Sequence, residues 1–332
     1  MRFILGMLRV ITALLILATA LPALLAILGF IVPYLDIFNH LQLLLFFGTL
    51  AGVIASLLFG MRRGWKALAI LGFLASAWTF VPEWLSSIAP HQQTSDVSTI
   101  RVMTHNVFGL NYDMERVAAV IAEEDPDIVA LQEFFPEQQR LGGLLKSRYP
   151  YSVVCRGGKR ANLGLYSKFA FEKKMSAADC PANAQGNQRT AHIIAAFTLS
   201  DGTAFSLMTT HMDWPLPAER QLDELNAAAE AINKIAGPLV VVGDFNSTPW
   251  SYALKGFAAA TGLKRETRNL ITYPLLFTVP ERLYPTGLLP LSPFLPLDHV
   301  FQRGVTVHSL HTGAATGSDH LPVIFEFSVN PP

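Results

Sequence analysis

Six short stretches of the sequence place polar or ionisable residues at the border of an apolar run. They are THNVFG at 104–109, DIVALQE at 127–133, TTHMDW at 209–214, PLVVVGDFNSTP at 238–249, LDHVF at 297–301 and GSDHLP at 317–322. Apolar runs of this length are typical of buried strands. Each stretch alone also fits a turn or a solvated strand end. Together, on strands that share a direction, they would gather carboxylates, amides and imidazoles at one edge of a sheet.

These residue types suit the hydrolysis of a phosphoric ester. The negative charge of the ester repels a nucleophile, so a site must supply a hard cation, a base for water and donors for the developing charge. Glu133 is a suitable ligand, because carboxylates hold Mg²⁺. Asp244 and Asn246 share one face of an extended chain, and His211 and His320 carry imidazoles, whose unperturbed pKa lies near neutral pH.

In order and wording, the motifs N-x-x-G, D-I-V-A-L-Q-E, T-H, G-D-F-N, D-H and S-D-H resemble the endonuclease/exonuclease/phosphatase superfamily. Its members include deoxyribonuclease I, abasic-site endonucleases, sphingomyelinases and inositol-phosphate phosphatases. The match runs from Arg101 to Phe327. The resemblance implies an α/β fold, a four-layer sandwich of two packed β-sheets flanked by helices. It also implies a hydrolase of phosphoric esters that uses Mg²⁺, with Mn²⁺ as the alternative.

The resemblance also implies a role for each matching residue. Glu133, Asn106 and Asp319 would bind the metal. Asp244 would orient or deprotonate the attacking water, and Asn246 would hydrogen bond to the same water or phosphate. The remaining set would act on the phosphate: His211 and His320 as donors to its oxygens or to the leaving group, Asp298 as the partner of His320, and Arg189 as a further phosphate contact.

Some positions depart from the nuclease pattern or lie outside the site. Phe108 stands where abasic-site enzymes carry an acid, and Met212 to Trp214 lack the tyrosine of those enzymes. Abasic-site cleavage is therefore disfavoured, whereas a one-metal phosphodiesterase fits every residue present. His105 and His299 are expected to be structural.

Three apolar runs precede this part of the chain, at about 10–32, 41–60 and 67–84. Each approaches the ~20 residues of a membrane-spanning helix. The first run also fits a cleaved signal peptide, because Ala18-Thr19-Ala20 resembles a cleavage site. Lys and Arg flank the first run at its start and occupy the Arg62–Lys66 loop, so the positive-inside bias places both in the cytoplasm. The rest would face the periplasm or the exterior, anchored in a bacterial inner membrane or a plasma membrane.

The sequence thus predicts a transmembrane anchor at 1–90, a linker at 91–99 and a catalytic domain at 100–332. Strands are expected at 100–105, 127–132, 151–155, 163–167, 192–199, 204–211, 239–244, 298–302, 305–310 and 323–327. Helices are expected at 114–124, 137–147, 218–235 and 251–259. Leu270–Leu297 contains six prolines, which exclude a regular helix or a central strand. We expect a long apolar loop there.

The cysteines and the charge balance narrow the class of function further. Cys155 and Cys180 are the only cysteines and fall in the part expected outside; they fit a disulfide or two buried thiols. Beyond residue 90 there are 20 Lys and Arg against 23 Asp and Glu. This balance disfavours a polynucleotide substrate, which usually requires a basic surface.

Two other classes of function remain as alternatives. An extracellular nuclease for DNA or RNA would use the same residues, whereas membrane attachment and the apolar loop favour a lipid headgroup. A non-catalytic membrane scaffold is expected to have lost at least one of Glu133, Asp244 and His320, and all three are present. The partners expected are the phosphoester and membrane lipid, and the sequence predicts no protein partner.

Overall fold

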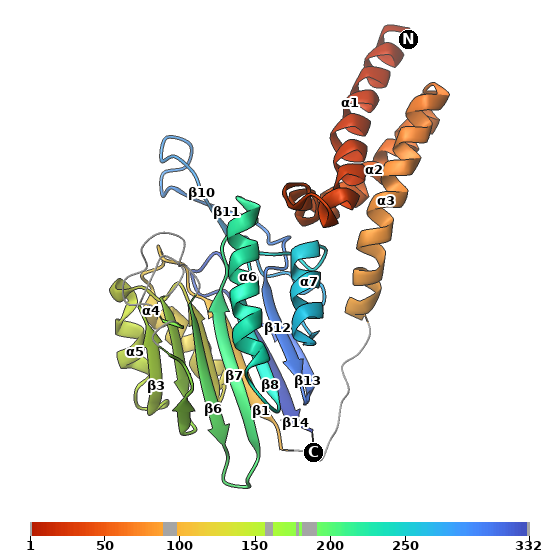
Figure 1. Cartoon of the computed structure of the whole chain (residues 1–332). Coiled ribbons are helices and arrows are strands. Elements are labelled where there is room, and N and C mark those ends of the chain that lie inside the picture. The colour runs from red at the N-terminus through yellow and green to blue at the C-terminus, as the bar shows by residue number, and fades with distance from the viewer. Residues whose placement is uncertain (1, 89–97, 157–161, 177–178, 181–190, 331–332) are drawn as a thin grey trace.

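The computed structural model describes residues 2–88, 98–156, 162–176, 179–180 and 191–330. Figure 1 shows three long amino-terminal helices that project from one end of a sandwich of two β-sheets. Most of the predicted linker 91–99 lies outside the described residues, as does Arg189.

The amino-terminal part consists of three long helices, α1 (Arg2–Ile27), α2 (Gln42–Leu58) and α3 (Arg63–Ile88). Two short 3₁₀ helices, η1 (Leu28–Phe30) and η2 (Pro33–Leu41), join α1 to α2. Within the described residues, three candidate spans are long and apolar enough to cross a membrane: Arg2–Phe30, Pro33–Leu58 and Arg63–Ile88. The first helix begins before the apolar run at residue 10, since its basic first turns are also helical.

Small residues let the three helices approach closely. A Cβ added at Gly72 of α3 would lie 2.4 Å from the Cβ of Ala20 on α1. A Cβ at Gly48 of α2 would lie 2.5 Å from the Thr19 side chain of α1. The three helices are therefore in close contact at these glycines, and a side chain at either position would push neighbouring helices apart.

The first sheet has the strand order β13-β14-β1-β2-β4-β3. Its strands are β1 (Ile100–Asn106), β2 (Ile128–Gln132), β3 (Tyr151–Cys155), β4 (Leu163–Ser167), β13 (Val305–Thr312) and β14 (Val323–Val329). The second sheet has the order β5-β6-β7-β8-β12-β9. Its strands are β5 (Phe171–Lys173), β6 (His192–Thr198), β7 (Ala204–His211), β8 (Leu239–Asp244), β9 (Lys264–Arg265) and β12 (Asp298–Arg303).

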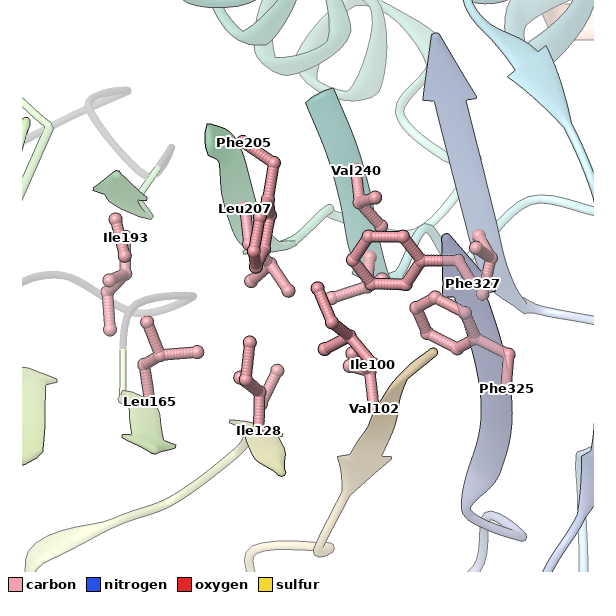
Figure 2. Packing of buried hydrophobic residues seen from close by; sticks show 14 of the residues in the cluster. Ile100, Val102, Ile128, Leu165, Ile193, Phe205, Leu207, Val240, Phe325 and Phe327 are labelled. Carbon is pink, nitrogen blue, oxygen red and sulfur yellow. The ribbon is translucent and has the colours of Figure 1, made fainter. Parts of the chain in front are cut away.

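The main core lies between the two sheets. Figure 2 shows Ile128 and Leu165 of the first sheet facing Leu207 and Val240 of the second, with Phe327 of β14, also in the first sheet, beside Val240. All five side chains are buried. Their removal from water supplies the main driving force for joining the sheets.

Helices cover the outer face of each sheet. Side chains alternate along a strand, so Val102 of β1 faces the main core while Met103 faces outward. Met103 packs with α4 (Met114–Glu124) and α5 (Arg140–Leu145). On the other side, α6 (Ala218–Asn233) and α7 (Tyr252–Thr261) pack on the second sheet (Figure 1). The predicted four-layer α/β sandwich, preceded by three long apolar helices, is confirmed.

The structure differs from the predicted local structure in three places. The helix expected at 137–147 is a 3₁₀ turn, η3 (Pro136–Gln138), followed by the shorter α5. The short strands β5 and β9 were not expected, because two or three residues carry too little pattern. The loop expected at Leu270–Leu297 contains a hairpin of β10 (Leu276–Thr278) and β11 (Leu288–Pro290). Pro290 is compatible with pairing because the hairpin is a separate two-stranded sheet, in which every strand is an edge.

Cys155 at the end of β3 and Cys180 are joined by a disulfide. Both cysteines lie against the main core. The bond ties the segment before β6 to the first sheet.

Candidate active site

Three predicted residues form a row across the second sheet. In the strand register, His211 on β7 and Asp298 on β12 are the direct neighbours of Asp244 on β8. The strands β7 and β8 are parallel and end at this edge, whereas β12 is antiparallel and begins there. The expectation that all site residues follow strands of one direction was therefore wrong. Strand starts and strand ends meet at the same edge.

The backbone around Asp244 requires specific residues. Gly243 has a φ of 147°, and a Cβ there would lie 1.9 Å from the Thr210 carbonyl oxygen. Only glycine fits this approach. Asn246 has a φ of 47°, in the left-handed region that few side chains adopt. Its N–H donates to Asp244 Oδ1 at 2.8 Å. The strand thus ends on a bend that returns Asn246 to the Asp244 carboxylate.

The first sheet supplies Asn106, at the end of β1, and Glu133, which follows β2. Asn106 Nδ2 donates to Asp244 Oδ2 at 3.0 Å and to Glu133 Oε1 at 3.3 Å. Its oxygen accepts from the Phe108 N–H at 2.9 Å, and Glu133 Oε2 accepts from the Gly109 N–H at 2.8 Å. Asn106 therefore bridges carboxylates from the two sheets. Asp244 and Glu133 face one site, not opposite sides of the domain.

Two histidines face the same carboxylate oxygen. His211 Nε2 lies 3.5 Å and His320 Nε2 lies 3.6 Å from Asp244 Oδ2. The other ring nitrogen of His320 lies 2.8 Å from Asp298 Oδ2, a hydrogen bond that orients the ring. Asn246 Nδ2 lies 3.3 Å from His211 Nε2 and donates to the Met212 carbonyl oxygen. Asp244 is the centre of the arrangement.

Burial and neighbouring charges shift the pKa values of these groups. Burial raises the pKa of Asp244, with Asp298 adding to the effect and the two histidines opposing it. Burial would lower the pKa of His320, but Asp298 and Asp244 outweigh it and raise the pKa to about 10. His320 is therefore cationic at neutral pH.

The two acids on the first-sheet side, Asp319 and Glu133, have pKa values that are shifted in opposite directions. Burial raises the pKa of Asp319 to about 7, with Glu133 and Asp244 adding to it. Burial would also raise the pKa of Glu133, but His211 and the Gly109 N–H lower it by more, so that pKa lies below its ordinary value. Glu133 is thus ionised at neutral pH and able to attract a cation.

The S-D-H stretch supplies two further contacts that the sequence did not predict. Ser318 Oγ donates to the Asn106 carbonyl oxygen at 2.6 Å and accepts from the His320 N–H at 3.0 Å. The Tyr273 ring packs on the His320 ring with centroids 4.7 Å apart. Ser318 could have been predicted as a site residue, because it lies inside the S-D-H motif. Tyr273 could not, because it lies in the proline-rich stretch.

His105 and His299, the two histidines expected to be structural, hydrogen bond to other residues of the protein. His299 Nε2 lies 2.7 Å from the Ser247 carbonyl oxygen and its Nδ1 2.9 Å from Thr267 Oγ1. His105 Nε2 lies 2.8 Å from Thr316 Oγ1. Burial lowers the pKa of each ring to about 3, so both stay neutral.

A buried cluster in this site is a candidate divalent-metal site. Ligating atoms of Asp244, Asp298 and His320 all lie within 4.8 Å of one another. Asp298 Oδ1 and Asn246 Oδ1 are buried and accept no hydrogen bond from the described part of the chain. Buried acceptors are normally satisfied, so these atoms point to a bound cation, water or substrate donor.

A two-sheet sandwich with acids, amides and imidazoles converging at one edge is the fold of a phosphoester hydrolase. Residues 103–320 match the endonuclease/exonuclease/phosphatase family, and the chain belongs to this family.

Solved structures show the same fold. The endonuclease/exonuclease/phosphatase of Bacteroides vulgatus has a TM-score of 0.55 and 22% identity, covering 70% of this chain and all of that one. D. rerio TDP2 complexed with a single-strand DNA product has a TM-score of 0.53 and 18% identity, covering 70% of this chain and 100% of that one.

Curated relatives are similar over a shorter length. A UPF0294 protein of Vibrio parahaemolyticus is 29% identical over 141 residues, 42% of this chain and 45% of that protein. A UPF0294 protein of Klebsiella pneumoniae is 29% identical over 143 residues, 42% of this chain and 48% of that protein. The chain thus spans less than half the length of these relatives.

Proposed function

We propose that the protein is a metal-dependent phosphoric-ester hydrolase anchored in a membrane, and that Asp244 activates the attacking water. The bridge from Asn106 to both Asp244 and Glu133 carries this proposal, because it joins the base of one sheet to the metal-binding acid of the other. We infer the division of the chain into an anchor at 1–90, a linker at 91–99 and a catalytic domain at 100–332.

Asp244 suits the role of base because its pKa is raised, which strengthens a carboxylate as a proton acceptor. His320 is held by Asp298 and is cationic, so its Nε2–H can donate to a phosphoryl oxygen or to the leaving oxygen. His211 and Asn246 lie on the other side of Asp244 and present further donors. Arg189 remains a candidate phosphate contact outside the described residues.

The donor set fits a hard divalent cation. Glu133 and Asp319 offer carboxylate oxygens, which Mg²⁺ prefers and Mn²⁺ also accepts. Asn106 Oδ1 accepts one hydrogen bond, from the Phe108 N–H, and its second lone pair can bind the cation, while its Nδ2 holds Glu133 in place. Asp298 and His320 already bind each other, which favours the metal on the Glu133 side of the buried cluster. When bound, the cation would neutralise charge on the phosphoryl oxygens.

The position of the site supports a substrate at the membrane surface. His40, in η2 between α1 and α2, accepts a hydrogen bond from the Thr248 N–H at 3.2 Å. Thr248 is two residues from Asn246, at most about 7 Å along the chain. The site therefore lies next to the membrane anchor.

The β10–β11 hairpin supports the same substrate class. In Figure 1 it extends from the end of the sandwich that carries the helices. Phe277 and Leu283 on it are exposed. Its base is tied to the site, since the Leu275 N–H donates to the Asp319 carbonyl oxygen at 2.7 Å. We infer that the hairpin contacts lipid and that the substrate is a lipid phosphoester. A nuclease is the alternative, since the fold is shared with a DNA-bound structure.

We also infer that the catalytic domain faces the periplasm or the exterior. The turn η2, which joins α1 to α2, contacts the domain, so this end of the bundle and the domain lie on one side of the membrane. Arg9 and the Arg62–Lys66 loop are at the other end of the bundle, where Arg9 donates to the Phe59 carbonyl oxygen. The positive-inside bias places that end in the cytoplasm, and the disulfide fits an oxidising exterior.

The test uses the full chain in lipid nanodiscs with Mg²⁺. Phospholipid vesicles, single-stranded DNA and bis(para-nitrophenyl) phosphate are compared as substrates. We expect hydrolysis of the chromogenic diester and of phospholipid, abolished by Asp244→Ala, by His320→Ala and by a chelator. Cleavage of DNA without cleavage of lipid would favour the nuclease. Inactivity on all three, or activity that survives Asp244→Ala, would contradict the proposal.

A further inference from the structure

The segment that follows Asp244 and Asn246 is buried beneath the membrane anchor. Ser247, Thr248 and Ser251 are each fully buried although their side chains are polar, and Trp250 is buried beside them. The Trp250 ring packs on Phe80 of α3, with ring centroids 5.7 Å apart. The segment 247–253 therefore has one face on the anchor, and its polar groups must find partners there.

Asp36 of η2 supplies most of these partners. Its carboxylate accepts from Ser251 Oγ at 2.8 Å, from the Tyr252 N–H at 2.9 Å and from the Ala253 N–H at 3.1 Å. The two N–H groups belong to the first turn of α7, which has no partner within its own helix. A negative charge at this end is also stabilised by the helix dipole. Asp36, more than 200 residues away in the chain, thus binds the first turn of α7 together with the N-cap residue Ser251, whose Oγ accepts from the Leu254 N–H.

His40 fixes the middle of the same segment. Its Nδ1 accepts from the Thr248 N–H and lies 3.3 Å from Thr248 Oγ1. On the opposite face, the Ser247 carbonyl oxygen is bound by His299, and Ser247 Oγ donates to Gln221. The segment is held between the domain on one face and the anchor on the other.

A chain of buried hydrogen bonds connects this contact to the interior of the helix bundle. Ser76 of α3 donates to Gln42 of α2 at 2.8 Å, and Gln42 donates to Asn39 at 2.9 Å. Asn39 in turn donates to Asp36 Oδ1 at 2.8 Å. All four side chains are buried. Polar groups inside membrane-spanning helices are costly and commonly functional, and these form one path from α3 to the catalytic segment.

We propose that Asp36 and His40 are positioning residues of the active site, so that the membrane anchor sets the geometry of Asp244 and Asn246. Asn246 has a left-handed backbone and binds Asp244 through its own N–H. Its conformation depends on where Thr248 and Ser251 are held. Loss of the anchor contact frees the segment, and a displacement of about 1 Å at a catalytic group costs about a hundredfold in rate. The kinetic part of the proposal rests on the proposed hydrolase function.

The test compares Asp36→Asn with Tyr34→Phe in the full chain in nanodiscs. Asp36→Asn keeps the side-chain shape but can turn an N–H donor toward the N–H groups of α7. Tyr34→Phe removes a different contact between anchor and domain, the hydrogen bond from Tyr34 to Glu219 on α6, and leaves the catalytic segment untouched. Hydrolysis of bis(para-nitrophenyl) phosphate gives kcat and KM, and amide hydrogen exchange is measured on peptides covering 246–253.

Asp36→Asn is expected to lower kcat by at least about tenfold, to leave KM within about twofold and to speed exchange at 246–253. Asp36→Ala should do the same more strongly, and Tyr34→Phe should change neither readout. Unchanged exchange in Asp36→Asn overturns the proposal, as does faster exchange with wild-type kcat or an equal effect of Tyr34→Phe. If the wild type hydrolyses no ester, the hydrolase function fails, and the exchange data still decide whether the anchor holds the segment.

Discussion

The two sides of the candidate site are held in different ways. On the first-sheet side, Glu133 and Asn106 are fixed within the domain by the N–H groups of Gly109 and Phe108. Gln138 secures that turn by donating to the Phe108 carbonyl oxygen at 2.7 Å. On the second-sheet side, the segment after Asp244 is held by Asp36 of the anchor. The side proposed to bind the metal is thus held within the domain, whereas the side proposed to activate water is also held by the amino-terminal helices.

The largest effect is expected where the two sides meet. Asp244→Ala removes the proposed base and the group that Asn106, His211 and His320 all face. We expect hydrolysis to fall by about 10³-fold or more. Asp201→Ala, in the exposed turn between β6 and β7, is the matched control and should leave the rate unchanged. Comparable rates in both variants would remove Asp244 from the mechanism.

The metal-binding side is tested by Glu133→Gln. Its amide no longer offers a charged oxygen, so the Mg²⁺ concentration needed for half-maximal activity should rise by at least about tenfold. The change should be the same in nanodiscs and in detergent, because Glu133 is held within the domain. An unaltered Mg²⁺ requirement would place the cation elsewhere.

The anchor-dependent side is tested far from the chemistry by Ser76→Ala. This change removes one buried hydrogen bond, to Gln42, worth about 1 kcal/mol. We therefore expect kcat to fall by no more than about fivefold. Thr12→Ala, buried in α1 with its hydroxyl bound to the Leu8 carbonyl oxygen, should have no effect on kcat. If the two variants behave alike, the path through Gln42 does not reach the site.

The smallest effect is expected at the hairpin. Leu283→Ser changes a side chain that is 71% exposed, so the fold should be as stable as before. If the hairpin contacts lipid, KM for a phospholipid in vesicles should rise a few-fold, whereas kcat on bis(para-nitrophenyl) phosphate should not change. Equal kinetics on vesicles would remove the hairpin from substrate binding.

The sequence predicted the architecture because its signals are local. The strands β3, β4, β7 and β8 have the predicted bounds, since short apolar runs bounded by turn or polar residues specify each one independently. The site residues were accessible for the same reason, because Asp244, Asn246 and Glu133 stand at the ends of such patterns.

The features that the sequence did not predict depend on contacts between residues that are distant in the chain. Asp36 and His40 lie in the short stretch between the first two predicted membrane spans, and their partners are more than 200 residues away. No local pattern links the two stretches. The hairpin inside Leu270–Leu297 was missed because prolines normally argue against strands, and here the hairpin pairs with no larger sheet. The antiparallel start of β12 at the site also required the sheet order, which periodicity does not specify.

The central claim is that acids from both sheets converge on one divalent cation beside Asp244. Anomalous X-ray scattering from crystals of the full chain grown with Mn²⁺ tests it most directly. The account predicts one Mn²⁺ peak in contact with Glu133 and Asp319 and next to Asp244, absent from Glu133→Gln. A peak held instead by Asp298 and His320, or a peak unchanged in Glu133→Gln, would contradict the account.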